Sequence, residues 1–118
     1  MDFYDRSGRA SHYINNNGTL YRWDGTPLGF VRGQNVYSNR GIHVAVVSGG
    51  WIRDHKGAAV LYSPGNLTSG GPLPPVPKVP PLKRIPRIPP VPAVPRVPPI
   101  PAVPKLSWSG ASFDSLFA

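Results

Sequence analysis

The chain has 118 residues, a net charge of +8, 17 prolines and no cysteine. Without cysteine there is no disulfide framework and no thiolate chemistry, and no apolar run approaches the roughly 20 residues that span a bilayer. Fifteen of the prolines follow residue 71, and the charge is +3 before that point and +5 after it. The first residues lack the layout of a secretory signal. We therefore expect a cytoplasmic protein that does not bind membranes, with signal-independent export left open.

The first 62 residues repeat with a period of 16 to 17. Gly8, Gly25, Gly41 and Gly57 mark the repeat, and each sits in a turn-like segment. An apolar residue precedes each glycine by five positions, and the first three of these residues are followed by tyrosine: Phe3, Leu20, Val36 and Ile52, then Tyr4, Tyr21 and Tyr37. A second apolar stretch follows each glycine. Each unit therefore predicts a β-hairpin with glycine in its turn.

These units predict an all-β domain over residues 1–62, with four hairpin repeats in a pseudo-fourfold radial arrangement. Its core should come from the repeated apolar positions Leu20, Phe30, Val36, Val46, Ile52 and Leu61. A domain of this size buries little of its surface. Because self-association is a common remedy for a small core, we expect a homo-oligomer.

Three short motifs carry a resemblance to a known family. They are Phe3-Tyr4-Asp5-Arg6-Ser7-Gly8, Leu20-Tyr21-Arg22-Trp23-Asp24-Gly25 and Gly50-Trp51-Ile52-Arg53-Asp54, followed by a basic, proline-rich tail. This pattern resembles the bacterial 4-fold beta flower family over roughly residues 1–65, and more loosely over the tail. The resemblance implies four hairpins around a pseudo-fourfold axis and a bacterial origin. It implies no catalytic residue.

Residues 63–71 form a linker rich in glycine and serine, and residues 72–106 repeat every three residues. One column of the triplet is proline, broken only by Lys83. The second column is aliphatic at all twelve positions from Leu73 to Leu106. The third mixes proline and alanine with the cations Lys78, Arg84, Arg87, Arg96 and Lys105. Because a polyproline II helix has three residues per turn, the segment predicts an extended polyproline II arm. A nine-residue repeat aligns Lys78, Arg87, Arg96 and Lys105 on one edge.

Two interpretations of this arm stay open. It is either a stiff, disordered spacer, or a rod whose aliphatic column is at least partly buried. In the second case the column lies along the chain's own domain, along sister tails in an oligomer, or in a partner's groove. We favour burial, because a solvated spacer has no use for twelve aliphatic positions. The basic PxxP motifs also fit a ligand of SH3-type domains, but the triplet register makes such matches inevitable.

Residues 107–118 form an aromatic C-terminal peptide that contains Trp108, Phe113, Leu116 and Phe117. The spacing of Phe113, Leu116 and Phe117 predicts a one-turn helical anchor. It is either a docking peptide for another protein or an end that folds back on its own domain or a sister subunit. As partner-binding residues of the tail we select Lys78, Arg84, Arg87, Arg96, Lys105, Trp108, Phe113 and Phe117.

Nothing in the sequence orients catalytic groups. His12, His43 and His55 lie in different repeats without metal-ligand spacing, and Asp5, Asp24 and Asp54 fit the backbone-bonding role of aspartate in turns. The chain has no glutamate. We therefore predict no enzyme, no cofactor and no metal.

The sequence favours a non-enzymatic protein-protein interaction or scaffold protein, whose proline-rich arm clasps an oligomer or binds a partner. The alternative is a nucleic-acid-binding protein. In that case the turn cations Arg6, Arg22, Arg40 and Lys56 would gather at one rim with the basic tail, beside tyrosines and Trp23 as stacking faces.

Overall fold

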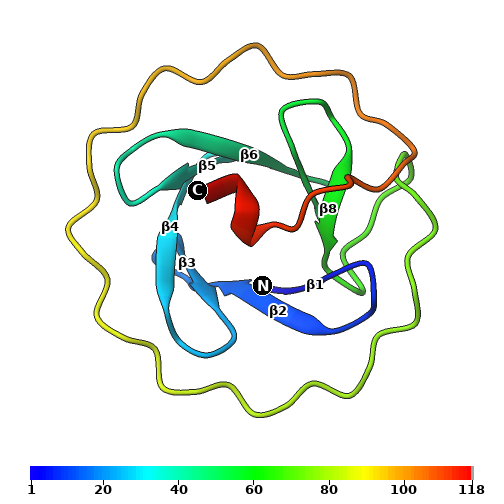
Figure 1. Ribbon diagram of the computed structural model, residues 1–118, viewed down its shortest axis with the longest axis horizontal. Coiled ribbons are helices and arrows are strands. Elements are labelled where there is room, and N and C mark those ends of the chain that lie inside the picture. Colours follow the sequence, from blue (N-terminus) through cyan, green and yellow to red (C-terminus); the bar gives the residue numbers. More distant parts are fainter. Residues whose placement is uncertain (118) are drawn as a thin grey trace.

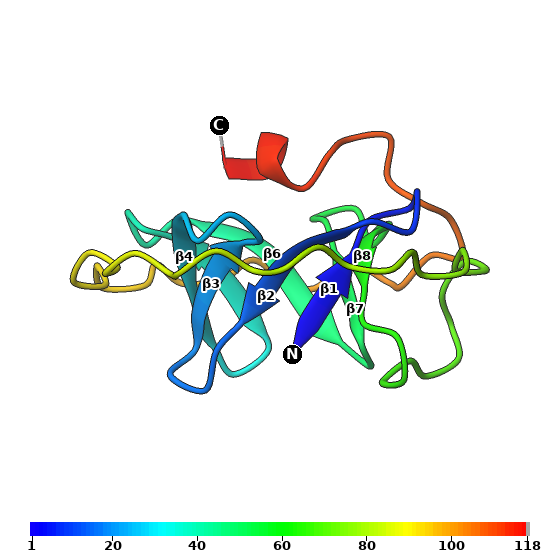
Figure 2. The same ribbon diagram turned by 90° about the horizontal axis from the view of Figure 1, so that it is seen from below.

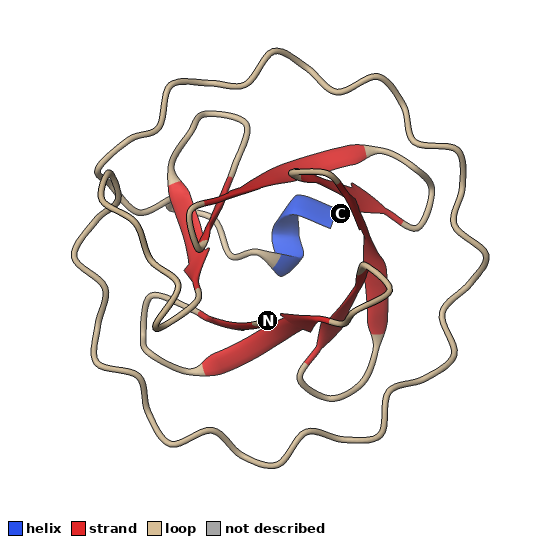
Figure 3. Ribbon diagram, turned by 180° about the vertical axis from the view of Figure 1, so that it is seen from behind, coloured by secondary structure: helices blue, strands red, loops and turns tan. Residues whose placement is uncertain are grey.

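The computed structural model describes residues 1–117, and its centre is a closed barrel of eight antiparallel strands (Figures 1 and 3). The strands follow one another around the barrel in chain order, and β8 returns to pair with β1 through Tyr62 and Tyr4. They are β1 (Asp2–Tyr4), β2 (Ala10–Ile14), β3 (Thr19–Arg22), β4 (Pro27–Arg32), β5 (Asn35–Ser38), β6 (His43–Ser48), β7 (Trp51–Arg53) and β8 (Ala59–Tyr62). The predicted all-β fold of hairpins is confirmed.

The same irregularity recurs in every hairpin. The pairing register shifts directly after the inward-facing apolar residue of the first strand, at Phe3/Tyr4, Leu20/Tyr21, Val36/Tyr37 and Ile52/Arg53. A bulge bends a strand and increases its twist, and such bends let short strands close into a barrel. The 16-residue sequence period is therefore also the period of the bends.

The interior of the barrel is filled by the first apolar residue of each repeat. Phe3, Leu20, Val36 and Ile52 are each 0% exposed and belong to one cluster with Ala45 and Leu61. Of the predicted core residues, Phe30 is buried outside this cluster, and Val46 is the one that needs correction. Phe30 stacks on Tyr37. Val46 is only half-buried and pairs with Arg53 across β6 and β7.

The segment after the linker does not leave the domain. Residues 72–106, here called the belt, contain no helix or strand and run once around the barrel near its turns (Figures 1 and 2). The Cα atoms of the whole molecule extend over 36 × 36 × 23 Å, the dimensions of a disc. The linker is tied down rather than loose, because Thr68 donates its N–H to Gly49 O at 2.9 Å and accepts from Trp51 Nε1 at 3.2 Å.

The last residues turn back over the end of the barrel that carries the hairpin turns (Figure 2). Residues 107–109 run beside β8, where Ala59 and Trp108 form a parallel bridge. A single 3-10 turn, η1 (Asp114–Phe117), follows. Phe113 is 3% exposed and enters the barrel cluster, so this peptide closes one end of the barrel. Ala118 lies outside the described residues. No helix in the described part is long and apolar enough to cross a membrane.

Candidate interaction surface

Besides a bond from the Arg84 N–H to Trp23 O at 3.3 Å, four backbone hydrogen bonds fasten the belt to the barrel, one at each repeated turn glycine. The donors are the N–H groups of Lys78, Arg87, Arg96 and Lys105, and the acceptors are the carbonyls of Gly8, Gly25, Gly41 and Gly57, at 2.8, 2.9, 2.9 and 3.0 Å. Proline has no N–H, so these four belt positions require another residue. One nine-residue unit of the belt therefore spans the same part of the circumference as one hairpin of the barrel, whose sequence period is 16 to 17 residues.

Each turn glycine lies directly beneath the belt. All four have φ between 81° and 90°, a backbone conformation that favours glycine. A Cβ built on Gly8, Gly25, Gly41 or Gly57 would approach the belt carbonyls of Val76, Ile85, Val94 or Val103 to 2.7 Å or closer. The repeated glycine thus serves two purposes, because it forms the turn and allows the close passage of the belt.

A buried arginine joins the two ends of the belt. Arg53 is 6% exposed and donates to three carbonyls: Gly57 at 3.0 Å, Lys105 at 2.8 Å and Gly70 at 2.7 Å. Gly70 precedes the belt and Lys105 lies at its end. Burial lowers the pKa of Arg53, yet a guanidinium remains charged at neutral pH. A charged donor with three acceptors closes the ring.

The single break in the proline column also has a structural reason. Lys83 Nζ lies 2.7 Å from Asp2 Oδ1 and stands 4.5 and 4.8 Å from the ring centroids of Tyr13 and Trp23. Trp23 in turn donates its indole N–H to Pro81 O at 2.8 Å. Lys83 therefore fixes the belt to the barrel between the first two glycine anchors, a contact that proline could not make.

The belt turns its aliphatic column outward. The twelve residues of that column are 72–95% exposed: Leu73, Val76, Val79, Leu82, Ile85, Ile88, Val91, Val94, Val97, Ile100, Val103 and Leu106. One predicted place for the burial of this column was the chain's own domain, and that prediction is wrong. The backbone hydrogen bonds to the turn glycines set the rotation of the belt about its own axis. The backbone N–H groups of the cation column must face the barrel, and in this orientation the aliphatic side chains face away from it.

The belt cations share this outer surface. Lys78, Arg84, Arg87, Arg96 and Lys105 are all exposed, and residues 72–106 contain no acidic residue. Four of them are the residues whose N–H groups bind the turn glycines. These four cations are aligned because their backbone N–H groups bind the turn glycines, and their exposed side chains are available to a partner.

The three aromatic residues predicted to bind a partner pack against the chain's own domain. Trp108 packs against Trp51 and Tyr62, with ring centroids 5.7 and 6.0 Å apart, and Phe113 is in the core. Phe117 is half-buried and stands edge-on to Phe113. The free docking peptide is therefore corrected to an end that folds back on its own domain.

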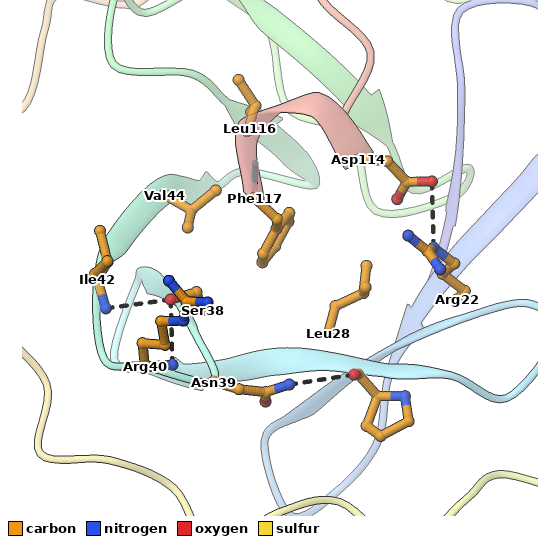
Figure 4. A pocket seen from close by; sticks show the side chains of 11 residues that line it. Arg22, Leu28, Ser38, Asn39, Arg40, Ile42, Val44, Asp114, Leu116 and Phe117 are labelled. Carbon is orange, nitrogen blue, oxygen red and sulfur yellow. Dashed lines mark hydrogen bonds and ion pairs between the residues drawn. The ribbon is translucent and has the colours of Figure 1, made fainter.

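The turn cations lie at the end of the barrel that the C-terminal peptide covers. Arg6 donates to Ser109 O at 3.0 Å, and Arg22 Nε forms an ion pair with Asp114 Oδ2 at 3.2 Å. Arg40 and Lys56 are exposed. Figure 4 shows Arg22 and Arg40 on the rim of an open depression of about 590 Å³, with Leu116 and Phe117 on its wall. The structure thus brings these cations to one rim, but Arg6 and Arg22 are bound to the C-terminal peptide.

Two of the tyrosines proposed as stacking faces are buried, and Tyr4 is half-buried. Tyr21 and Tyr37 are each 4% exposed and stack against Tyr13 and Phe30. The equivalent pairs in the other two repeats are Val46 with Arg53 and Tyr62 with Tyr4. Aromatic side chains are therefore part of the layer between barrel and belt in three repeats, and Arg53 replaces a tyrosine in the remaining one.

Two polar networks involve histidine. Ser11 Oγ, His12 and Asp114 form a chain with both hydrogen bonds at 2.8 Å, and the bond from His12 holds the pKa of Asp114 below its usual value. His43 bonds to Asn35 and His55 at 3.0 and 2.9 Å. The first chain fastens the C-terminal peptide to β2. Within residues 1–117 no group of three or more metal-ligating side chains comes together.

Two groups that complete the assembly were not among the predicted site residues: Arg53, and the pair of His12 with Asp114. A signal for Arg53 was present, because its repeat is the one in which the apolar residue is not followed by tyrosine. The pair of His12 and Asp114 joins residues 102 positions apart, and no local pattern indicates it.

Comparison with known proteins gives one match. A family model described as "4-fold beta flower protein" matches residues 1–117, which includes the belt and the C-terminal peptide. No curated protein and no solved structure matches the chain.

Proposed function

The chain belongs to the 4-fold beta flower family, and from its geometry we propose that it is a non-enzymatic protein-interaction module. The barrel serves as a hub, and the belt that surrounds it presents aliphatic and cationic side chains to a protein partner. The observation that carries this proposal is the continuous outward aliphatic column, 72–95% exposed around the whole circumference.

Isolated exposed apolar residues are normal, whereas a contiguous apolar surface usually marks a binding site. Burying half of each of the twelve side chains would contribute about 0.7–1.5 kcal/mol apiece, or on the order of 10 kcal/mol before the costs of association. Those costs are reduced, because the barrel already holds the belt in one shape. A rigid apolar display of this kind favours recognition over a role as a spacer.

We further propose that the belt follows a polyproline II path. At about 3.1 Å per residue, nine residues span about 28 Å, so four units make a circumference of about 110 Å. A circle of that length has a diameter of about 36 Å, and the molecule measures 36 × 36 Å across the disc. The agreement supports an extended chain with three residues per turn.

The charge of the belt supports a partner other than a second copy. Two belts would meet with like charges, since each carries six cations and no acidic residue. Like charges placed together oppose association. An acidic protein with an apolar surface fits both features. Homo-oligomerisation remains a prediction, and belt-to-belt contact is a poor way to achieve it.

Nucleic acid is the second candidate, and the observation that favours it is the same set of belt cations together with the exposed Arg40 and Lys56. It leaves the aliphatic column without a role. The buried Tyr21 and Tyr37 also remove the expected stacking faces.

The test compares the native chain with the triple variant Val91→Ser, Val94→Ser, Val97→Ser, purified from the cells that produce the protein. All three side chains are at least 88% exposed, so we expect an unchanged thermal midpoint but the loss of an acidic protein that co-purifies stoichiometrically with the native chain. Equal recovery with both proteins would contradict the proposal. A fluorescent single-stranded oligonucleotide separates the alternative, since tight binding that falls steeply with salt would favour nucleic acid.

A further inference from the structure

The exposed aliphatic column differs from an ordinary apolar patch in its curvature. It runs around the entire disc, and its residues lie on all sides of the barrel (Figure 1). Each of the four belt units contributes the same arrangement, with an aliphatic residue directly after each anchoring cation: Val79, Ile88, Val97 and Leu106. These four residues are 94, 95, 92 and 72% exposed.

This curvature restricts what can cover the column. A flat surface meets a convex ring only along a short arc, and a second disc meets it only where the two rims touch. Both would leave most of the twelve side chains in water. A surface that covers all of them has to be concave and follow the ring.

The chemistry restricts the partner further. Cations occur in every belt unit, at Lys78, Arg87, Arg96 and Lys105, and no acidic residue accompanies them. Charged groups at four points of the ring argue against burial in hydrocarbon. They fit carboxylates placed beside an apolar groove, because complementary charges fix register at an interface.

We infer that the belt is the seat for a protein collar: a ring- or tube-shaped acidic partner whose inner wall carries a narrow aliphatic groove and encircles the disc. This inference rests on the proposed function and adds the shape of the partner. Packed layers of backbone lie about 10 Å apart. With a disc 36 Å across, the bore of the collar measures about 55 Å between opposite backbones. Both faces of the disc stay free.

The experiment places a photo-crosslinking residue, p-benzoylphenylalanine, in the full-length chain at one equivalent position per belt unit. The four variants replace Val79, Ile88, Val97 or Leu106, and a fifth replaces Gln34, an exposed residue outside the belt. Each is expressed in the cells that produce the protein and irradiated there. Far-ultraviolet circular dichroism of each purified variant checks that the barrel is intact.

We expect the same acidic protein to be crosslinked from all four belt positions with yields within about threefold of one another, and not from position 34. Crosslinking from one position or two adjacent ones would overturn the collar but leave an interaction protein that binds along an arc. Different proteins at different positions, or phospholipid at all of them, would also overturn it. No belt-specific product from any position would overturn both the collar and the proposed function.

Discussion

Isoleucine occurs in the barrel and in the belt of this molecule with opposite surroundings. Ile52 is 0% exposed and lies in the interior cluster, whereas Ile88 is 95% exposed and points away from the disc. The barrel is held by continuous strand pairing around its apolar residues. The belt is held by hydrogen bonds of its backbone and by a few polar side chains, and its apolar side chains do not contribute to this attachment. The comparison shows that the belt's order comes from the barrel, and that its aliphatic residues are available for another task.

The largest effect should separate the two isoleucines. Ile52→Ala should lower the free energy of unfolding by about 2–5 kcal/mol, because it removes buried methylene groups and leaves a cavity. Ile88→Ala should change it by no more than about 0.5 kcal/mol. Urea denaturation followed by tryptophan fluorescence measures both. Similar losses in the two variants would mean that the belt residue is buried, contrary to the structure.

The closure of the belt should depend on Arg53. Arg53→Met keeps much of the apolar length but leaves the carbonyls of Gly70 and Lys105 without their donor, while Gly57 keeps its bond from the Lys105 N–H. We expect a loss of about 2–3 kcal/mol and release of both belt ends, seen as new proteolytic cleavage near residues 70 and 105. Arg32→Met removes an exposed cation and serves as the control. If the belt of the Arg53 variant resisted proteolysis as the native chain does, the ring would be closed by other contacts.

Substitutions at two glycines can distinguish the cost of a positive φ from the cost of blocking the passage of the belt. Gly25 and Gly65 have φ of 90° and 82°, but a Cβ on Gly25 would meet the belt while one on Gly65 would meet nothing within 4 Å. Gly65→Ala should cost about 1–2 kcal/mol for its backbone conformation alone. Gly25→Ala should cost more and should loosen the belt near Arg87. Equal thermal midpoints for the two variants would show that the belt does not pass over the turn.

The smallest expected effect is a pH dependence from His43. Burial, and then the nearby His55, lower the pKa of His43 from its ordinary 6.5. The unfolded chain therefore binds a proton more readily, so the stability that neutral His43 contributes is present above pH 6.5 and is lost as the pH falls toward its lowered pKa. Thermal midpoints between pH 7.5 and 5.5 should fall less for His43→Gln than for the native chain. If the thermal midpoints of the two proteins changed with pH in parallel, His43 would not be the source of the pH dependence.

The barrel was predictable because its determinants are local. Turn glycines and alternating apolar residues specify hairpins, and their repetition specifies four of them. The three columns of the belt were also visible in the sequence. Which column faces the barrel was not, because the choice depends on where the N–H groups of Lys78, Arg87, Arg96 and Lys105 meet the turn carbonyls. Those contacts join residues that are 48 to 70 positions apart in the chain.

Hydrogen exchange of the belt amides, followed by nuclear magnetic resonance on the full-length chain, tests the central claim most directly. The N–H groups of Lys78, Arg87, Arg96 and Lys105 bind the barrel, while the next residue in each unit belongs to the exposed column. We predict slow exchange at these four amides and fast exchange at Val79, Ile88, Val97 and Leu106. Fast exchange throughout residues 72–106 would contradict the account, because it would describe a belt that does not hold the barrel.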